Sequence, residues 1–166
     1  MALDITIGGT AADSYATLLE YTSRAAAMGW TLEGTDAANE VNLRRAAVAI
    51  DASYSFRGTK NTVAQAREWP RFDGSGYGMV YDFDPYPLRS DEIPQRVKDA
   101  QMEMAYLIQG GADPLATYTG GIKRQKVDVI EVEYAGAQGR PRYDAVDRIL
   151  GPYLTAGPGQ GRMVRA

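Results

Sequence analysis

One segment near the middle of the chain constrains the fold most strongly: "IPQRVKDAQMEMAYLIQGG", residues 93–111. Its apolar and small residues recur at the spacing of one helix face, a proline stands where a first helical turn tolerates it, and two glycines follow the last apolar residue. The segment therefore predicts a helix from about Pro94 to Gly110 that buries Val97, Ala100, Gln101, Met104, Leu107 and Ile108.

Further helices are predicted on both sides of this segment. Asp13 is a candidate N-cap for a helix through about Met28, with Tyr15, Leu18 and Leu19 on its apolar side. Thr35 is a candidate cap for a longer helix with the buried stripe Leu43, Ala46, Ile50 and Tyr54. A short helix is expected from about Thr62 into Trp69-Pro70, and a last one from about Tyr143, broken or kinked at Gly151-Pro152, with Val146, Ile149 and Leu150 inward.

The period changes in residues 121–134, "GIKRQKVDVIEVEY". Ile130, Val132 and Tyr134 alternate with glutamates, which indicates a strand, and the basic stretch before them predicts a hairpin that sets Lys and Arg opposite Glu. The fold class expected is mainly α: a bundle of four to five helices with a small β-hairpin and an extended C-terminal tail. We expect one domain over residues 1–155, including an irregular aromatic-rich loop 70–92, and a flexible tail over 156–166.

The composition excludes much chemistry. The chain of 166 residues has no cysteine and no histidine, so disulfides, thiolate metal sites and the commonest general base are absent. Its few lysines stand in no nucleophile motif, and it has no Walker-type phosphate loop. Asp73, Asp82 and Asp84 are too few and too crowded by prolines for a calcium loop. We expect no enzyme, no cofactor and no metal site. With no apolar run long enough to span a bilayer, we expect a soluble, intracellular protein.

Charge is distributed unevenly along the chain. The net charge is −3, but residues 1–40 hold one basic against six acidic residues, a net charge of −5. Residues 139–166 hold five basic against two acidic residues, a net charge of +3. An acidic start and a basic end suit self-association of copies, although chance variation on a solvated surface gives the same pattern.

Six aromatic residues fall within positions 69–86, among glycines, prolines and acids. Proteins that bind single strands combine stacking rings with positive charge, but here Arg71 is the only basic residue, against three aspartates. Contact with protein fits better, because interface cores are rich in aromatic residues. We expect Trp69 to close the core, and a subunit-contact loop of Phe72, Tyr77, Tyr81, Phe83 and Tyr86.

The tail "GPGQGRMVRA", residues 157–166, cannot form a stable helix, yet it ends in two apolar residues between two arginines. An extended segment of this kind can add a strand to an exposed sheet edge of a partner. We therefore predict a docking tail of Gly161, Arg162, Met163, Val164 and Arg165. The alternative is a disordered end without a role.

Five segments occur in an order that resembles a known family: "ADSYATLLEY", "AQAREWPR", "DEIPQRVKDAQMEMAYL", "VIEVEYA" and "YDAVDRILGPYL". Together they resemble the head-to-tail adaptor, or connector, proteins of tailed bacteriophages and prophages, whose members are often labelled DnaT-like single-stranded-DNA-binding proteins. The resemblance runs from about Ala12 to Leu154.

The resemblance implies a structural virion protein, located at the head-tail junction and assembled in the bacterial cytoplasm. It implies a ring of copies, a dodecamer in the family, that docks below the portal protein and extends the DNA channel. A stopper or tail-completion protein would bind the other side, DNA would only pass through the channel, and no membrane is involved. The docking tail would then grip the portal. The alternative function is single-stranded-DNA binding in phage replication, and a regulatory module that docks by its tail is a third possibility.

Overall fold

The computed structural model describes residues 2–72, 88–117, 124–127, 130–133 and 142–155. Within these ranges the chain forms four α-helices, one short 3-10 helix and two small antiparallel sheets of two strands each. The predicted fold class, mainly α with a small hairpin, is confirmed. No helix in the described part of the chain is long and apolar enough to cross a membrane. The predicted tail lies outside these ranges.

The first helix begins later than the sequence predicted. α1 spans Leu18–Met28, and its N-cap is Thr17, whose hydroxyl accepts a hydrogen bond from the amide of Glu20. The Glu20 carboxylate in turn accepts one from the Thr17 amide at 2.7 Å, which completes a capping box. Asp13 was therefore the wrong cap. Leu19 is 74% exposed, so its predicted place on the apolar side was also wrong.

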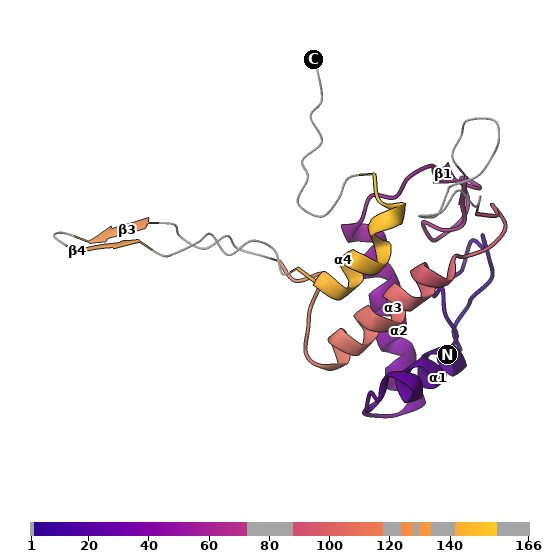
Figure 1. The fold of residues 1–166 in the computed structure, drawn as a ribbon, viewed down its shortest axis with the longest axis horizontal. Helices are drawn as coiled ribbons and strands as arrows, with labels where there is room; N and C mark the ends of the chain where they lie inside the picture. Colours follow the sequence, from indigo (N-terminus) through magenta and orange to yellow (C-terminus); the bar gives the residue numbers. More distant parts are fainter. Residues whose placement is uncertain (1, 73–87, 118–123, 128–129, 134–141, 156–166) are drawn as a thin grey trace, which may run out of the picture.

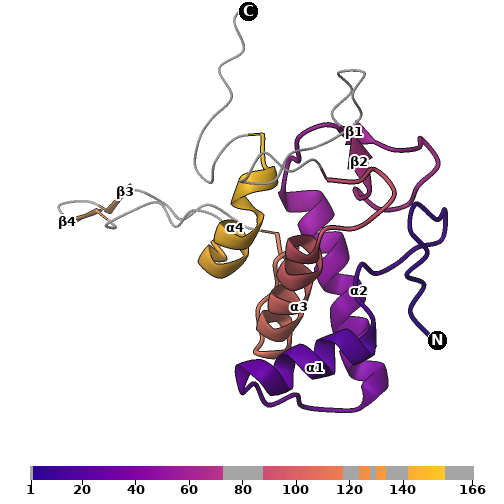
Figure 2. The same cartoon turned by 45° about the vertical axis from the view of Figure 1, so that its right-hand side comes forward.

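Three other helices build the body of the molecule: α2 (Asp36–Ser53), α3 (Gln95–Gln109) and α4 (Asp144–Leu150). α3 packs against both α2 and α4, and α1 crosses one end of α2 and α3 (Figures 1 and 2). The predicted starts are confirmed, since Thr35 caps α2 and Pro94 precedes α3. After α4 the chain tightens into a 3-10 helix, η1 (Gly151–Tyr153), at the predicted break.

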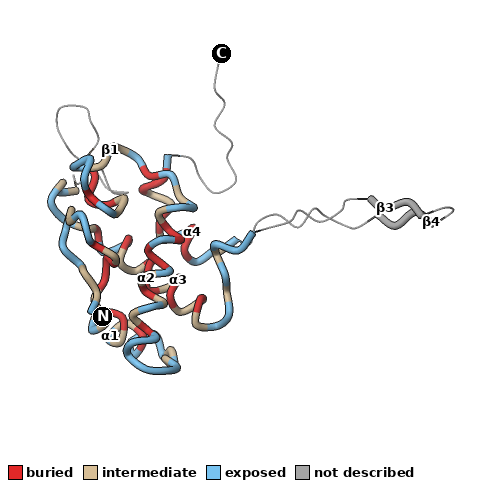
Figure 3. Tube along the Cα trace, turned by 180° about the vertical axis from the view of Figure 1, so that it is seen from behind, coloured by how far each residue is buried: buried red, intermediate tan, exposed pale blue. Residues whose placement is uncertain are grey.

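The core lies along the contacts of α2, α3 and α4, where the buried positions gather (Figure 3). The predicted stripes are confirmed for Leu43, Ala46, Ile50, Val97, Ala100, Gln101, Met104, Ile108, Val146 and Leu150, which are all buried. Tyr54, Leu107 and Ile149 are half-buried and pack on the edge of this core. Each large apolar side chain buried in this way contributes about 1.5–3 kcal/mol.

The helix predicted from about Thr62 is not formed. Residues 61–70 instead make turns between two short strands, β1 (Thr59–Lys60) and β2 (Arg71–Phe72), which pair antiparallel. The side chain of Gln65 replaces helical hydrogen bonds: its amide oxygen accepts from the Thr62 amide, and its amide nitrogen donates to the Pro70 carbonyl. The Trp69-Pro70 peptide bond is cis.

The predicted hairpin is confirmed as β3 (Arg124–Val127) and β4 (Ile130–Glu133). Its register sets Arg124 opposite Glu133 and Lys126 opposite Glu131, as expected from the alternation of the sequence. The two strands lie apart from the helical body in both Figure 1 and Figure 2.

Candidate functional site

Two rings of the aromatic segment, residues 69–86, lie in the described part of the chain: Trp69 belongs to the core, and Phe72 belongs to strand β2. Trp69 is 1% exposed, and its ring lies against Phe56 and Tyr153, with centroids 5.6 Å and 5.4 Å away. Its predicted role in closing the core is confirmed. Phe72 is half-buried on β2, opposite Thr59 of β1. The other residues of the predicted subunit-contact loop and the docking tail lie outside the described residues: Tyr77, Tyr81, Phe83, Tyr86, Gly161, Arg162, Met163, Val164 and Arg165.

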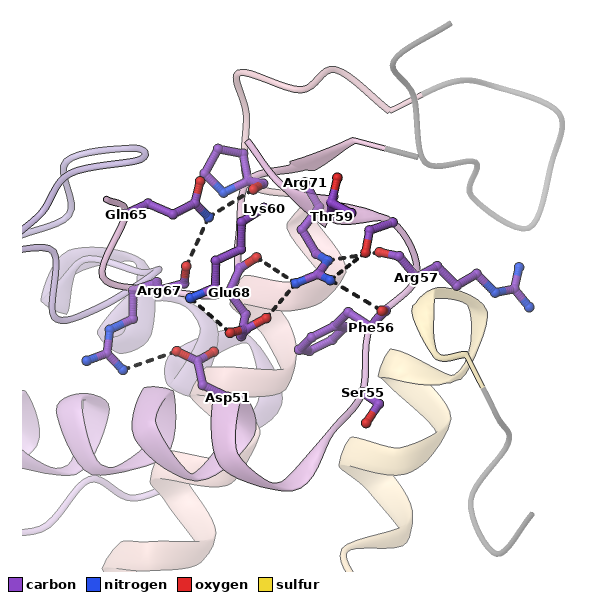
Figure 4. A network of polar contacts seen from close by, with 12 residues as sticks. Asp51, Ser55, Phe56, Arg57, Thr59, Lys60, Gln65, Arg67, Glu68 and Arg71 are labelled. Atoms are coloured by element: carbon purple, nitrogen blue, oxygen red, sulfur yellow. Dashed lines mark hydrogen bonds and ion pairs between the residues drawn. The ribbon is translucent and has the colours of Figure 1, made fainter. Parts of the chain in front are cut away.

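Arg71 of β2 is the centre of a polar network (Figure 4). Its guanidinium is folded inward and donates to the backbone carbonyls of residues 56, 57, 58 and 68, at distances from 2.6 to 3.4 Å. It also donates to the Glu68 carboxylate and lies 6.0 Å from the centre of the Phe56 ring. Arg71 is only 8% exposed, so its guanidinium stabilises the loop by hydrogen bonds and is not available to a ligand at the surface.

Glu68 receives a second cation in the same network. The Lys60 ammonium on β1 lies 3.0 Å from the Glu68 carboxylate, which also pairs with Arg71 (Figure 4). One carboxylate thus holds β1 and β2 together through two basic side chains. Lys60 is half-buried, and its ammonium pairs with Glu68 of the same chain.

A neighbouring group of polar side chains joins α2 to the N-terminal segment. The Tyr15 hydroxyl donates to the Asp51 carboxylate of α2 and accepts from the Glu68 amide at 3.1 Å. Arg67 donates to the same carboxylate at 3.2 Å and to the Ala12 carbonyl at 3.1 Å. The loop that leads to the aromatic segment is therefore tied to both α2 and the start of the chain.

Burial perturbs two acids of this group. Burial raises the pKa of the Asp51 carboxyl from its ordinary 3.8 to about 6, and this effect outweighs the opposing hydrogen bond from Tyr15 and the charge of Arg67. The pKa of the Tyr15 phenol is raised well above its ordinary value, mainly by burial and further by the charge of Asp51. Such shifts accompany catalytic groups, but a buried structural pair produces them equally well.

A second aromatic group was not predicted from the sequence. Trp30, after α1, stacks on Tyr106 of α3 with ring centroids 4.6 Å apart and planes 7° apart. The Arg24 guanidinium lies 5.8 Å from the Trp30 centroid and pairs with Asp99 at 2.9 Å. Nothing in the spacing of these residues signals the stack, because it depends on how α1 crosses α3.

The acidic start of the chain is partly neutralised within the monomer. Arg44 of α2 pairs with Asp13 at 2.6 Å and with Glu40 at 3.7 Å. Lys98 of α3 pairs with Glu20 at 2.7 Å. Half of the six acids in residues 1–40 are thus held by cations of the same copy, so the predicted charge attraction between copies is weaker than the sequence suggests.

The described part of the chain is therefore a helical domain in which cations hold loops and helix starts together. The whole chain, residues 1–166, matches the family described as "Putative DnaT-like ssDNA binding protein". The protein belongs to this family. Comparisons with curated proteins and with solved structures gave no match.

Proposed function

We propose that this protein is a structural assembly protein that binds copies of itself and protein partners. The observation that carries the proposal is the position of Arg71. A site for single strands needs cations beside its rings, yet the only basic residue among positions 69–86 is buried and bonded to backbone carbonyls and Glu68. The rings of this segment suit a protein partner better than a phosphate backbone.

In its finer form, the proposal is a head-to-tail adaptor of a tailed bacteriophage or prophage. The resemblance of the five ordered segments supports it, as does the net charge of −3, because a channel wall must let DNA slide rather than hold it. Copies would form a ring below the portal, and a stopper or tail-completion protein would bind the other face. The tail with Arg162 and Arg165 would dock on the portal, with many copies supplying avidity.

The second candidate is single-stranded-DNA binding, which the description of the family favours. The Trp30–Tyr106 stack could serve as a platform for bases, but Arg24 beside it faces two acids, Asp99 and Glu103. The local charge therefore disfavours phosphates there as well.

A fluorescence anisotropy titration with oligothymidylate separates the two candidates. We expect no submicromolar binding near physiological salt. Submicromolar affinity with a steep dependence on salt would support the DNA-binding candidate and contradict the adaptor proposal.

A further inference from the structure

The two strands of the β3–β4 hairpin carry opposite charges. β3 contains Arg124 and Lys126 and no acid, whereas β4 contains Glu131 and Glu133 and no base. Within the described residues the sheet consists of these two strands alone, so one outer edge belongs to a basic strand and the other to an acidic strand. Each outer edge presents backbone groups that are able to pair with another strand.

A hairpin of two strands is marginally stable in water by itself. Packing against a helix would stabilise it, but this hairpin lies apart from α1 to α4 in both views (Figures 1 and 2). Pairing with a further strand would also supply hydrogen bonds and cover the edges.

We propose that the β4 edge of one copy pairs with the β3 edge of the next copy, so that the hairpins of a ring form one continuous sheet. This inference rests on the proposed ring. Rotational symmetry gives all hairpins the same direction, and β4 runs opposite to β3. The strand β4 is therefore antiparallel to β3 of the next copy, and each new contact joins an acidic strand to a basic one.

The opposite charges of the two outer edges, basic at β3 and acidic at β4, indicate that the strand that pairs with each edge comes from a second copy of this chain. A strand of another protein with one sign of charge would fit only one edge and be repelled at the other. A nucleic acid would be attracted by β3 and repelled by β4. A copy of the same hairpin matches both edges at once, and closure of the ring leaves no edge unpaired.

Two charge-reversed hairpins test this pairing. In the first, Arg124→Glu with Lys126→Glu makes both strands acidic; in the second, Glu131→Lys with Glu133→Lys makes both strands basic. Each variant alone should need about tenfold more protein, or more, to form rings, because like charges then meet between copies. An equal mixture should assemble at a clearly lower concentration than either variant alone, since an acidic strand of one variant meets a basic strand of the other at every new contact.

Restoration in the mixture separates contact between copies from contact within a hairpin, because each hairpin of the mixture still carries like charges. The variant Arg89→Glu with Arg148→Glu controls for net charge, since both arginines are exposed on the helical body. Ring formation is followed by sedimentation velocity and electron microscopy, with the protein alone and with portal particles. Rings of wild type and of both unmixed variants at equal concentration would overturn the pairing and leave the ring proposal standing. Loss in the single variants without restoration in the mixture would also overturn it. Absence of rings in the wild type would overturn the ring proposal and the pairing together.

Discussion

At the residue scale, Arg71 links the carbonyls of residues 56–58 to Glu68 in the turn before β2. The variant Arg71→Ala would leave these buried and part-buried acceptors without their donor, so we expect the free energy of unfolding to fall by about 2–3 kcal/mol. Urea unfolding measures the change. The matched control Arg89→Ala removes an exposed ion pair with Asp91 and should change stability by less than about 0.5 kcal/mol. Equal effects of the two variants would contradict the structural role of Arg71.

Burial raises the pKa of the Asp51 carboxyl to about 6 in the folded chain. The folded state then binds this proton more tightly than the unfolded state, whose pKa is near 3.8. The contribution of the group to stability is full below about pH 4 and is lost as pH rises through about 6.

We therefore compare the wild type with Asp51→Asn, which cannot titrate. The stability of the wild type relative to the variant should decrease by about 2–3 kcal/mol between pH 4 and pH 7. Urea unfolding at several pH values measures this difference, and other titrating groups cancel in it. A difference that is constant or that grows with pH would show that the folded-state pKa of Asp51 is not raised.

Some residue-scale features could be read from the sequence and others could not. Trp69 was predicted in the core because large aromatic rings are usually buried in a fold of this size. The start of α1 was misplaced because Asp13 and Thr17 are both good caps, and the deciding signal is Glu20 three residues after Thr17. The burial of Arg71 could not be predicted from the sequence, because its acceptors are backbone carbonyls that only the fold brings close to it.

At the element scale, Gln101 joins the N-terminal segment to α2 and α3. Its side-chain oxygen accepts from the amides of Tyr15 and Ala16, both at 2.9 Å, and its nitrogen donates to Ser14 and to the Leu43 carbonyl. Replacement by leucine keeps the volume but leaves the buried amides of Tyr15 and Ala16 without their acceptor.

We expect Gln101→Leu to lower the free energy of unfolding by about 3 kcal/mol or more. The control Gln95→Leu changes the same residue type at an exposed position of the same helix and should have little effect. Chemical unfolding compares the two variants. A Gln101→Leu protein as stable as its control would show that this side chain does not hold the N-terminal segment.

The subunit-contact loop gives a second prediction at this scale. Replacing Tyr77, Tyr81 and Tyr86 together by serine should leave the melting temperature of the monomer nearly unchanged and impair assembly, because these rings are predicted to contact neighbouring subunits rather than the core. Differential scanning fluorimetry and sedimentation velocity measure the two effects. A collapse of the melting temperature would place these rings in the core instead.

The elements with strong periodicity were predictable: α2, α3, α4 and the hairpin follow from spacing alone. The segment 61–70 was not, because long-range contacts override its local pattern. The Ala66 amide donates to the Gly9 carbonyl, and Arg67 reaches Ala12, more than fifty positions away. Such contacts form only once the N-terminal segment is in place, so a local pattern cannot reveal them.

At the scale of the whole molecule, we propose that the small helical body makes its external contacts through three segments: the β3–β4 hairpin, the aromatic segment 69–86 and the C-terminal tail 157–166. The cations of the described body mostly stabilise its own loops and helices, as with Arg71, Arg67 and Arg44. This arrangement fits a protein that repeats around a ring better than one that grips phosphates along a strand.

Electron microscopy of portal particles mixed with the purified protein tests whether the protein forms a ring on the portal. We expect an additional ring of density below the portal, coaxial with its channel, and we expect this ring to be lost when residues 157–166 are deleted. Two results together would contradict this proposal. Portals would carry no added ring at saturating protein concentration, and the same preparation would bind oligothymidylate tightly and in a salt-dependent way.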